Sequence, residues 1–253
     1  MLESAIIIML NEYPFPHIIC KEFVPLDLIE KVKKEYDEIL NNELHEWVEY
    51  NNPIEHKLSF NKFKNTTYLK QLLPIMGNPE FINHLQNTFG IEDIELDTDL
   101  YGAGLHNHPR GGHLCTHLDY EINPITFKKR WLNLILYIND DWKDEYNGDT
   151  ELWNNDRTIC EKRVYPEFNK ALIFRTDNKS WHGVSREICC PVNKSRKSIA
   201  FYYVSKRSYK DDVDDNTRMK ALFYDPKYPK LCEIRSKRQL TKKDIEEWEQ
   251  KDA

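Results

Sequence analysis

The chain has 253 residues, 40% of them hydrophobic and 31% charged, which is an ordinary balance for a globular protein with one sizeable domain. Its 42 acidic and 36 basic residues give a net charge of −6, so no overall positive field attracts nucleic acid or an anionic membrane. The apolar run from Ala5 to Leu10 is too short for a bilayer and follows no basic leader, and six cysteines resemble no secreted disulfide framework, so we expect a cytoplasmic protein with reduced thiols.

Residues 1–93 are expected to form a mostly helical support within a single domain. The clearest helix is Leu28–Leu40, whose apolar residues recur at steps of four, four and three, with Asp27 as the N-cap. Further helices are expected over Tyr68–Leu73 and over Pro79–Phe89, the latter ended by Gly90. The Asn- and Lys-rich residues 41–66 permit no assignment.

Residues 94–205 have the pattern of an antiparallel β-sandwich or barrel, because short β-like runs alternate with turn residues. Asn147-Gly148 is the clearest hairpin signal. The expected strands are Glu95–Tyr101, Leu114–Leu118, Trp131–Ile138, Thr150–Trp153, Ala171–Arg175 and Ser198–Val204.

The strand Trp131–Ile138 has two different faces. Leu132 and its i+2 partners make one face entirely aliphatic, which should pack on the N-terminal helices. The other face carries Asn133 and Tyr137 and should look into a cavity. The strongly charged residues 206–253 are expected to pack on the outside, with a last helix near Lys242–Gln250.

His117-Leu118-Asp119 is the segment with the most chemical information. Residues i and i+2 of a strand point to the same side, so this spacing puts an imidazole beside a carboxylate. A second imidazole from a distant strand, His182, would complete the two-histidine, one-carboxylate set that binds non-haem Fe(II) and leaves coordination positions open.

Three more histidines lie near these residues. His106 and His108 share a face if the chain is extended there, and His113 lies four positions before His117. A helical zinc site at His113 and His117 is disfavoured by the two glycines that precede it, Gly111-Gly112. These three histidines are interpreted as polar loop residues or as side chains behind the metal ligands.

Arg196 lies fourteen positions after His182 and just before a β-like run. A guanidinium at this place can bind a carboxylate through two parallel hydrogen bonds, which a lysine cannot do. Tyr137 can donate a hydrogen bond to the same carboxylate, although a buried tyrosine with a backbone partner is an equally good interpretation.

Taken together, these segments resemble the Fe(II)- and 2-oxoglutarate-dependent dioxygenases, in particular their prolyl-hydroxylase-like branch. The resemblance covers about Leu100 to Val204. It is carried by Gly102-Ala-Gly-Leu-His106, Gly111-Gly-His-Leu-Cys-Thr-His-Leu-Asp119, the run from Arg130 to Trp142, Asn147-Gly-Asp-Thr-Glu-Leu-Trp153, His182-Gly183 and Arg196-Lys-Ser-Ile-Ala200.

The resemblance implies an α+β, mainly β fold: a double-stranded β-helix, or jelly-roll, flanked by N-terminal helices. It implies that Fe(II) is bound by His117, Asp119 and His182, and that 2-oxoglutarate is bound by Arg196, Tyr137, Asn133 and Ser198. O2 is the oxidant and ascorbate the expected reductant. His106 and Trp181 are expected near the metal ligands, and Trp131 and Trp153 are further candidates for the lining of the site.

The implied function is hydroxylation of an unactivated C–H bond, with release of succinate and CO2. The substrate is a protein side chain, such as a prolyl residue, or a small molecule, and residues 41–66 and 120–129 are expected to face it. Lysine replaces Arg196 in collagen-type relatives, and the step from His182 to Arg196, which includes Cys189-Cys190-Pro191, is longer than in oxygen-sensing relatives.

Two other functions stay open. One is a jelly-roll sensor that holds a metal or an acidic ligand without turnover. A pure binder, however, needs neither open metal positions nor a guanidinium for a cosubstrate. The other is a zinc hydrolase that uses His113 and His117, which would need a water-activating base and would ignore 2-oxoglutarate.

Overall fold

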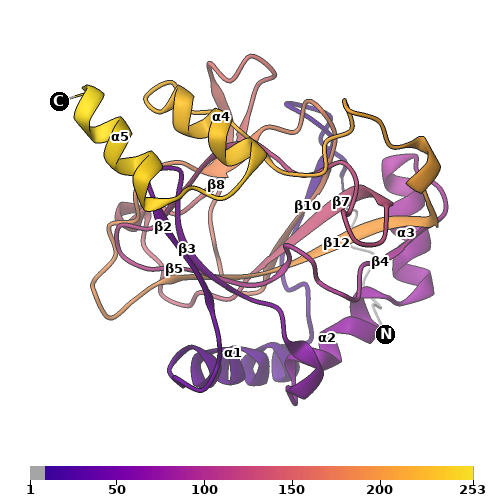
Figure 1. Cartoon of the computed structure of the whole chain (residues 1–253). Coiled ribbons are helices and arrows are strands. Elements are labelled where there is room, and N and C mark those ends of the chain that lie inside the picture. The colour runs from indigo at the N-terminus through magenta and orange to yellow at the C-terminus, as the bar shows by residue number, and fades with distance from the viewer. Residues whose placement is uncertain (1–8, 253) are drawn as a thin grey trace.

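The computed structural model describes residues 9–252 (Figure 1). Residues 1–8, which include most of the apolar run Ala5–Leu10, lie outside the described residues. Within the described part of the chain, no helix is both long and apolar enough to span a membrane.

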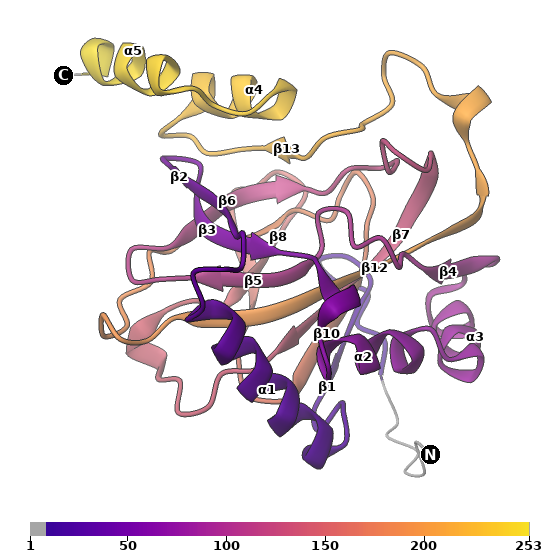
Figure 2. The same cartoon turned by 60° about the horizontal axis from the view of Figure 1, so that its bottom comes forward.

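Within residues 9–252, thirteen strands form one antiparallel sheet that folds over itself into two layers (Figure 2). The first layer contains, in spatial order, β1 (His17–Cys20), β10 (Lys170–Arg175), β7 (Lys128–Tyr137), β12 (Arg196–Ser208) and β5 (Gly104–His108). The second contains β6 (His113–Leu118), β11 (His182–Val184), β8 (Thr150–Trp153) and β9 (Cys160–Val164). Strand β3 (Glu55–Phe60) joins the layers, because it pairs with β5 and then with β6.

The chain alternates between the layers as it proceeds: β5, β7, β10 and β12 lie in one, and β6, β8, β9 and β11 in the other. The two layers face each other, since Tyr137 and Leu172 of the first pack with Leu152 and Val164 of the second. The predicted double-stranded β-helix is confirmed. Shorter strands extend it: β2 (Val48–Asn52) pairs with β3, β4 (Ile94–Leu96) with β12, and β13 (Leu222–Phe223) with β6.

The outer face of the first layer is covered by the N-terminal helices. These are α1 (Leu26–Leu40), α2 (Leu69–Met76) and α3 (Pro79–Phe89), and a 3-10 turn, η1 (Phe63–Asn65), precedes α2. The aliphatic face of β7 packs against these helices as predicted: Leu132, Leu134, Leu136 and Ile138 are fully buried in one cluster with Ile29, Leu72 and Leu85. Each such side chain contributes about 1.5–3 kcal/mol of burial free energy.

The helix boundaries follow local chemistry. Helix α3 begins and ends where predicted: the Asn78 side chain accepts hydrogen bonds from the backbone N–H groups of Glu80 and Phe81, and Gly90 ends it with a left-handed φ of 60°. The prediction of Asp27 as the N-cap of α1 is wrong. Pro25 holds that position, and Asp27 lies in the first turn, where its carboxylate complements the helix dipole.

Two strand predictions need correction, and one stretch without an assignment contains strands. Asn147-Gly148 forms no two-residue hairpin, because β7 and β8 belong to opposite layers; it follows the 3-10 turn η2 (Asp144–Tyr146). The predicted strand Glu95–Tyr101 ends at Leu96, since the Asp97 side chain accepts a hydrogen bond from the Asp99 backbone N–H and turns the chain. Residues 41–66, left unassigned, contain the β2–β3 hairpin, and the N-terminal part therefore contributes three strands as well as helices.

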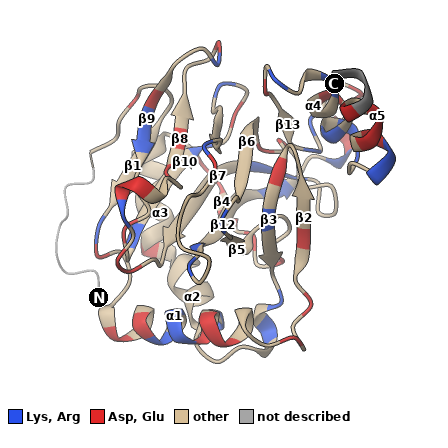
Figure 3. Cartoon of the chain, turned by 90° about the vertical axis from the view of Figure 1, so that its left-hand side faces the viewer, with Lys and Arg blue, Asp and Glu red and all other residues tan. Residues whose placement is uncertain are grey.

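The C-terminal segment is more ordered than an external charged tail. After the 3-10 turn η3 (Lys210–Asp212) it supplies β13, helix α4 (Pro229–Lys237) and the predicted last helix, α5 (Lys242–Asp252). Figure 3 shows acidic and basic residues side by side on α5, in agreement with its ion pairs at i and i+4. Through β13, this segment reaches the strand that carries His117.

Candidate metal centre

His117, Asp119 and His182 lie together between the two layers, and all three are buried. His117 is on β6 and is directly opposite His182 on the neighbouring strand β11, while Asp119 follows β6 by one residue. The Nε2 atom of each histidine is 3.7 Å from an oxygen of the Asp119 carboxylate. The three side chains that the sequence predicts as metal ligands therefore lie in one cluster.

Both imidazoles are oriented by the backbone. The Nδ1 of His117 is 2.9 Å from the carbonyl oxygen of Cys115, and the Nδ1 of His182 is 2.9 Å from that of Ser180. Since a carbonyl only accepts, each Nδ1 carries the proton, and each Nε2 presents a lone pair toward Asp119. A neutral imidazole whose other nitrogen donates to a carbonyl is the usual form of a histidine ligand to a metal.

The electrostatics keep His117 and Asp119 in the protonation state that a cation requires. Burial, together with the neighbouring His182, lowers the pKa of His117 to about 3. Burial alone would raise the pKa of Asp119, but His182, His117 and Arg130 outweigh it and lower this pKa to about 2. At neutral pH the cluster therefore offers a neutral nitrogen from His117 and an anionic oxygen from Asp119.

Asp119 is held from two sides. The Asn133 side-chain N–H donates to one Asp119 carboxylate oxygen at 2.9 Å, and Arg218 donates to its backbone carbonyl at 2.7 Å. The Oδ1 of Asn133 is buried and has no partner within the described residues. The donor set, two nitrogens and one oxygen with an open side toward a cavity, fits a non-haem Fe(II) ion.

Aromatic rings pack on both imidazoles. Phe174 of β10 lies edge-on to His182 at a centroid distance of 4.6 Å, and Phe223 of β13 stacks on His117 at 5.4 Å. Sequence reasoning missed Phe223 and Arg218, because both lie in the charged segment that was interpreted as external. The apolar run Ala221-Leu-Phe-Tyr224 within that segment was the available signal.

Arg196, at the start of β12, is a fully buried cation. Its Nε donates to the carbonyl of Gly148 at 2.5 Å, its Nη1 to the Ser198 hydroxyl at 3.2 Å and its Nη2 to the Thr150 hydroxyl at 3.0 Å. No carboxylate lies within 4 Å of this guanidinium in residues 9–252. A desolvated guanidinium with only neutral partners is an anion-binding group.

Tyr137 lies beside Arg196, with its ring centroid 5.3 Å from the guanidinium carbon. Its hydroxyl donates to Thr150 at 2.7 Å, and burial raises its pKa to about 12. Thr150 thus accepts from both Tyr137 and Arg196, a role that the sequence did not reveal. The predicted set of Arg196, Tyr137 and Ser198 is brought together, and Asn133 lies apart from it, against Asp119.

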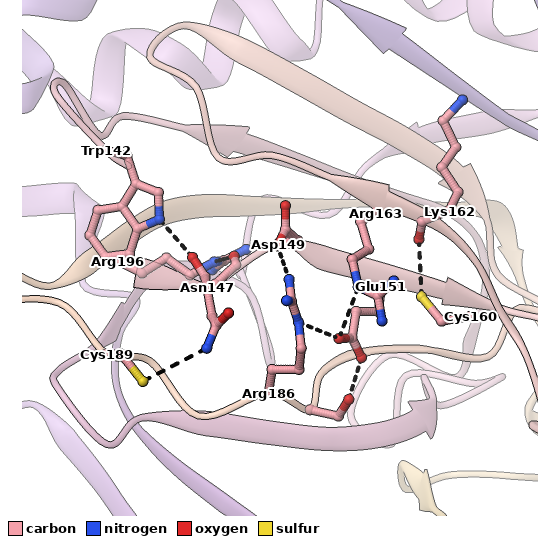
Figure 4. A network of polar contacts seen from close by, with 12 residues as sticks. Trp142, Asn147, Asp149, Glu151, Cys160, Lys162, Arg163, Arg186, Cys189 and Arg196 are labelled. Atoms are coloured by element: carbon pink, nitrogen blue, oxygen red, sulfur yellow. Dashed lines mark hydrogen bonds and ion pairs between the residues drawn. The ribbon is translucent and has the colours of Figure 1, made fainter. Parts of the chain in front are cut away.

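Residues 147–149, which contact Arg196, are held in place by polar contacts with residues 186–187 (Figure 4). The Asn147 side chain donates to the carbonyl of Glu187 at 2.8 Å, and Arg186 forms an ion pair with Asp149. Gly148 has a φ of +90°, and a Cβ atom there would lie 3.2 Å from the Cδ of Arg196. The glycine therefore allows the close approach of backbone and guanidinium.

The metal cluster and Arg196 open into one cavity of about 720 Å³. His106 and His108 line it, and burial lowers the pKa of both well below the usual range.

His113 lies outside the cavity, between the carbonyls of Gly111 and Pro53, so the hydrolase site at His113 and His117 is not formed. Trp181 is also outside the cavity and packs on Tyr224. The lining contains Trp47 in place of the three expected tryptophans.

One family model matches part of the chain. Residues 103–204 match the 2OG-Fe(II) oxygenase superfamily. The matched residues include His117, Asp119, His182 and Arg196. They do not include β3 or the C-terminal segment. No curated protein sequence matches the chain.

Solved structures share the fold. A Pseudomonas putida prolyl-4-hydroxylase is 18% identical, with a TM-score of 0.55 over 76% of this chain and 93% of its own. A Trichoplax adhaerens prolyl hydroxylase, solved with a hypoxia-inducible-factor peptide, is 15% identical, with a TM-score of 0.56 over 75% of this chain and 84% of its own. HygX from Streptomyces hygroscopicus, solved with nickel, 2-oxoglutarate and hygromycin B, is 10% identical, with a TM-score of 0.52 over 75% and 83%.

Proposed function

We propose that this chain, whose residues 103–204 match the 2OG-Fe(II) oxygenase superfamily, hydroxylates an organic substrate with His117, Asp119 and His182 as the iron ligands. 2-Oxoglutarate is the cosubstrate and is converted to succinate and CO2. One observation carries the proposal. The candidate metal ligands share a cavity with the buried Arg196 guanidinium, which has no carboxylate partner among the described residues.

An iron ion held by His117, Asp119 and His182 would supply the oxidising chemistry. The protein residues have three tasks. Asn133 and the carbonyls of Cys115 and Ser180 hold the ligands in the form that binds a cation. Arg196, Ser198 and Thr150 offer donors to the distal carboxylate of 2-oxoglutarate. Phe174 and Phe223 exclude water from the two imidazoles.

The cavity contains two attachment points that suit 2-oxoglutarate. An anion at Arg196 and a cation at His117, Asp119 and His182 are the two attachment points that 2-oxoglutarate needs, since it has a carboxylate at one end and a keto acid at the other. The relatives of similar fold include one bound to a peptide and one bound to an aminoglycoside, so both substrate classes remain part of the proposal.

An anaerobic titration tests the proposal. Purified metal-free protein is titrated with Fe(II) and then with 2-oxoglutarate, and the visible metal-to-ligand charge-transfer band is followed. We expect the band in the wild type and its loss in His117→Ala. If Fe(II) binds and no band forms, the cosubstrate site is wrong and a metal-binding sensor becomes the better interpretation.

A further inference from the structure

The substrate end of the cavity is built from segments outside the family match. Its walls come from the β2–β3 hairpin, from the turn at Tyr101, and from the C-terminal residues between Met219 and Gln239. In the proposed function these walls bind neither iron nor 2-oxoglutarate. The charges of their side chains therefore indicate which kind of substrate the cavity accepts.

The charges on these walls are unequal. Beyond Arg196, five basic residues line the cavity, against two carboxylates other than Asp119. Three of the basic residues have carboxylate partners: Lys62 contacts Glu46 at 2.6 Å, Arg235 pairs with Glu55, and Arg238 contacts Asp244 at 2.7 Å.

A fourth, Lys220, donates to the backbone carbonyl of Lys237 and lies at the exposed rim. The fifth basic residue is Lys57 of β3, and its side chain is only 14% exposed. It makes no hydrogen bond to any residue between 9 and 252.

Glu55 does not neutralise Lys57. The Lys57 Nζ is 3.9 Å from a Glu55 oxygen, which is beyond hydrogen-bond distance, and the same carboxylate already pairs with Arg235. The Tyr50 ring also lies near this ammonium, with its centroid 5.5 Å from the Lys57 Nζ. Two cations thus share one carboxylate, which leaves a positive charge on a desolvated ammonium that faces the cavity. Burial accordingly lowers the pKa of Lys57.

2-Oxoglutarate does not account for this charge. In the proposed function, one of its ends is bound by Arg196 and the other by the iron. Lys57 belongs to a different strand from Arg196, with β5 between the two strands, because β3 pairs with β5 and β5 pairs with β12. Neighbouring strands are about 4.8 Å apart, so the backbones of Lys57 and Arg196 are about 10 Å apart.

We propose that Lys57 binds a carboxylate of the substrate, so that the enzyme acts on an organic acid or on an acidic residue of a peptide. This inference rests on the proposed function and specifies its substrate class. The carboxylate would complete the charge balance between Lys57, Arg235 and Glu55, and Tyr50 would lie against the organic part of the substrate. Lys57 is then a residue for substrate selection that does not take part in iron or cosubstrate binding.

The test uses the full chain with Fe(II) and saturating 2-oxoglutarate under anaerobic conditions, so that Arg196 is already occupied. The probes are benzoate and benzamide, which have similar shape and differ in charge. Paramagnetic broadening of their ring protons by the iron measures binding near the metal. We expect benzoate to bind about tenfold or more tightly than benzamide, the value of a hydrogen bond to a charged group.

The variants assign the effect to one residue. Lys57→Met should abolish the preference for benzoate, and Lys57→Arg should retain it. Lys64→Met should leave it unchanged, because that lysine is exposed and does not line the cavity. In all three variants the charge-transfer band reports that the protein is folded and binds 2-oxoglutarate. The peptides acetyl-Gly-Glu-Gly-amide and acetyl-Gly-Gln-Gly-amide are tested in the same way. A stronger preference for the Glu peptide over the Gln peptide than for benzoate over benzamide indicates a peptide substrate, and the reverse indicates a small acid.

Equal binding of each acid and its amide would overturn the inference, and so would weaker 2-oxoglutarate binding in Lys57→Met, which would place Lys57 in the cosubstrate site. These results are distinguishable from failure of the proposed function. If no charge-transfer band forms in the wild type, the proposed function itself is wrong.

Discussion

The ring of Phe223 stacks on the imidazole of His117 with an interplanar angle of 25°, and the two residues are directly opposite each other in the β13–β6 pair. A residue of the charged C-terminal segment therefore forms part of the metal centre. Arg218, from the same segment, donates to the backbone of Asp119. The C-terminal segment is thus a wall of the site, even though it lies outside the residues that match the superfamily.

Replacement of Phe223 by alanine should loosen this wall. Because the side chain is 6% exposed, we expect a loss of about 2–4 kcal/mol in the free energy of unfolding, together with weaker iron binding. Urea unfolding and Fe(II) titration measure the two effects. Phe223→Leu, which keeps an apolar cover, is the control and should bind iron nearly as well as the wild type. Unchanged iron affinity in the alanine variant would show that the stacking has no role at the metal.

Replacement of Arg196 by methionine should weaken binding of the cosubstrate and leave binding of the metal intact. The variant lacks the guanidinium that donates to Ser198 and Thr150, so we expect 2-oxoglutarate to bind about 100-fold more weakly while Fe(II) still binds. The charge-transfer titration gives both constants. Arg196→Lys should recover only part of the affinity, since an ammonium cannot donate two parallel hydrogen bonds. Normal 2-oxoglutarate affinity in the methionine variant would contradict the assignment.

Gly148→Ala should weaken 2-oxoglutarate binding without removing any polar group. Its φ of +90° disfavours a side chain, and the added Cβ would press on both Arg196 and Trp142, at 3.2 and 3.3 Å. We expect about a tenfold rise in the dissociation constant of 2-oxoglutarate. Gly90→Ala is the matched control: Gly90 also has a positive φ, of 60°, but has no atom within 4 Å of the added Cβ. It should lose stability and keep its cosubstrate affinity.

The stability of the metal-free protein should fall on acidification, partly because of His117. Its folded pKa of about 3 is below the unfolded value near 6.5, so between these values the unfolded chain binds more protons than the folded one. His117 therefore stabilises the fold fully above pH 6.5, and this contribution declines as the pH falls toward 3. The slope reaches about 1.4 kcal/mol per pH unit.

Asp119 adds to the same trend at lower pH, since its folded pKa of about 2 is below the unfolded value near 3.8. Urea unfolding of metal-free wild type and His117→Gln between pH 4 and 7 measures the histidine contribution. The glutamine variant should show the shallower pH dependence. Parallel curves for the two proteins would mean that His117 titrates normally in the folded state.

The parts of this fold that were predicted from the sequence are those where local pattern and tertiary environment agree. The period of two in β7 places aliphatic residues such as Leu134 against the helices and Asn133 toward the cavity. The same period in β6 puts His117 beside Asp119. Helix α3 was predicted to its ends, because Asn78 and Gly90 carry their own capping chemistry.

The remaining features depend on contacts between segments far apart in the sequence. Asn147-Gly148 has the composition of a hairpin turn, but the alternation between layers sends β8 away from β7. Phe223 and Lys57 have meaning at the site only because β13 pairs with β6 and β3 pairs with both layers. Neither residue is part of a motif. The apolar run 221–224 indicates that Phe223 is buried, but only the strand pairing places it at the site.

The dual pairing of β3 has a consequence for cosubstrate length. This one strand is hydrogen-bonded to β5, next to the strand of Arg196, and to β6, the strand of His117. The separation between the anion site and the metal ligands is therefore set by a continuous hydrogen-bonded backbone, which deforms much less than side-chain packing. We therefore expect selection among keto diacids by their number of carbons, because a homologue one methylene shorter or longer than 2-oxoglutarate would not match a fixed gap.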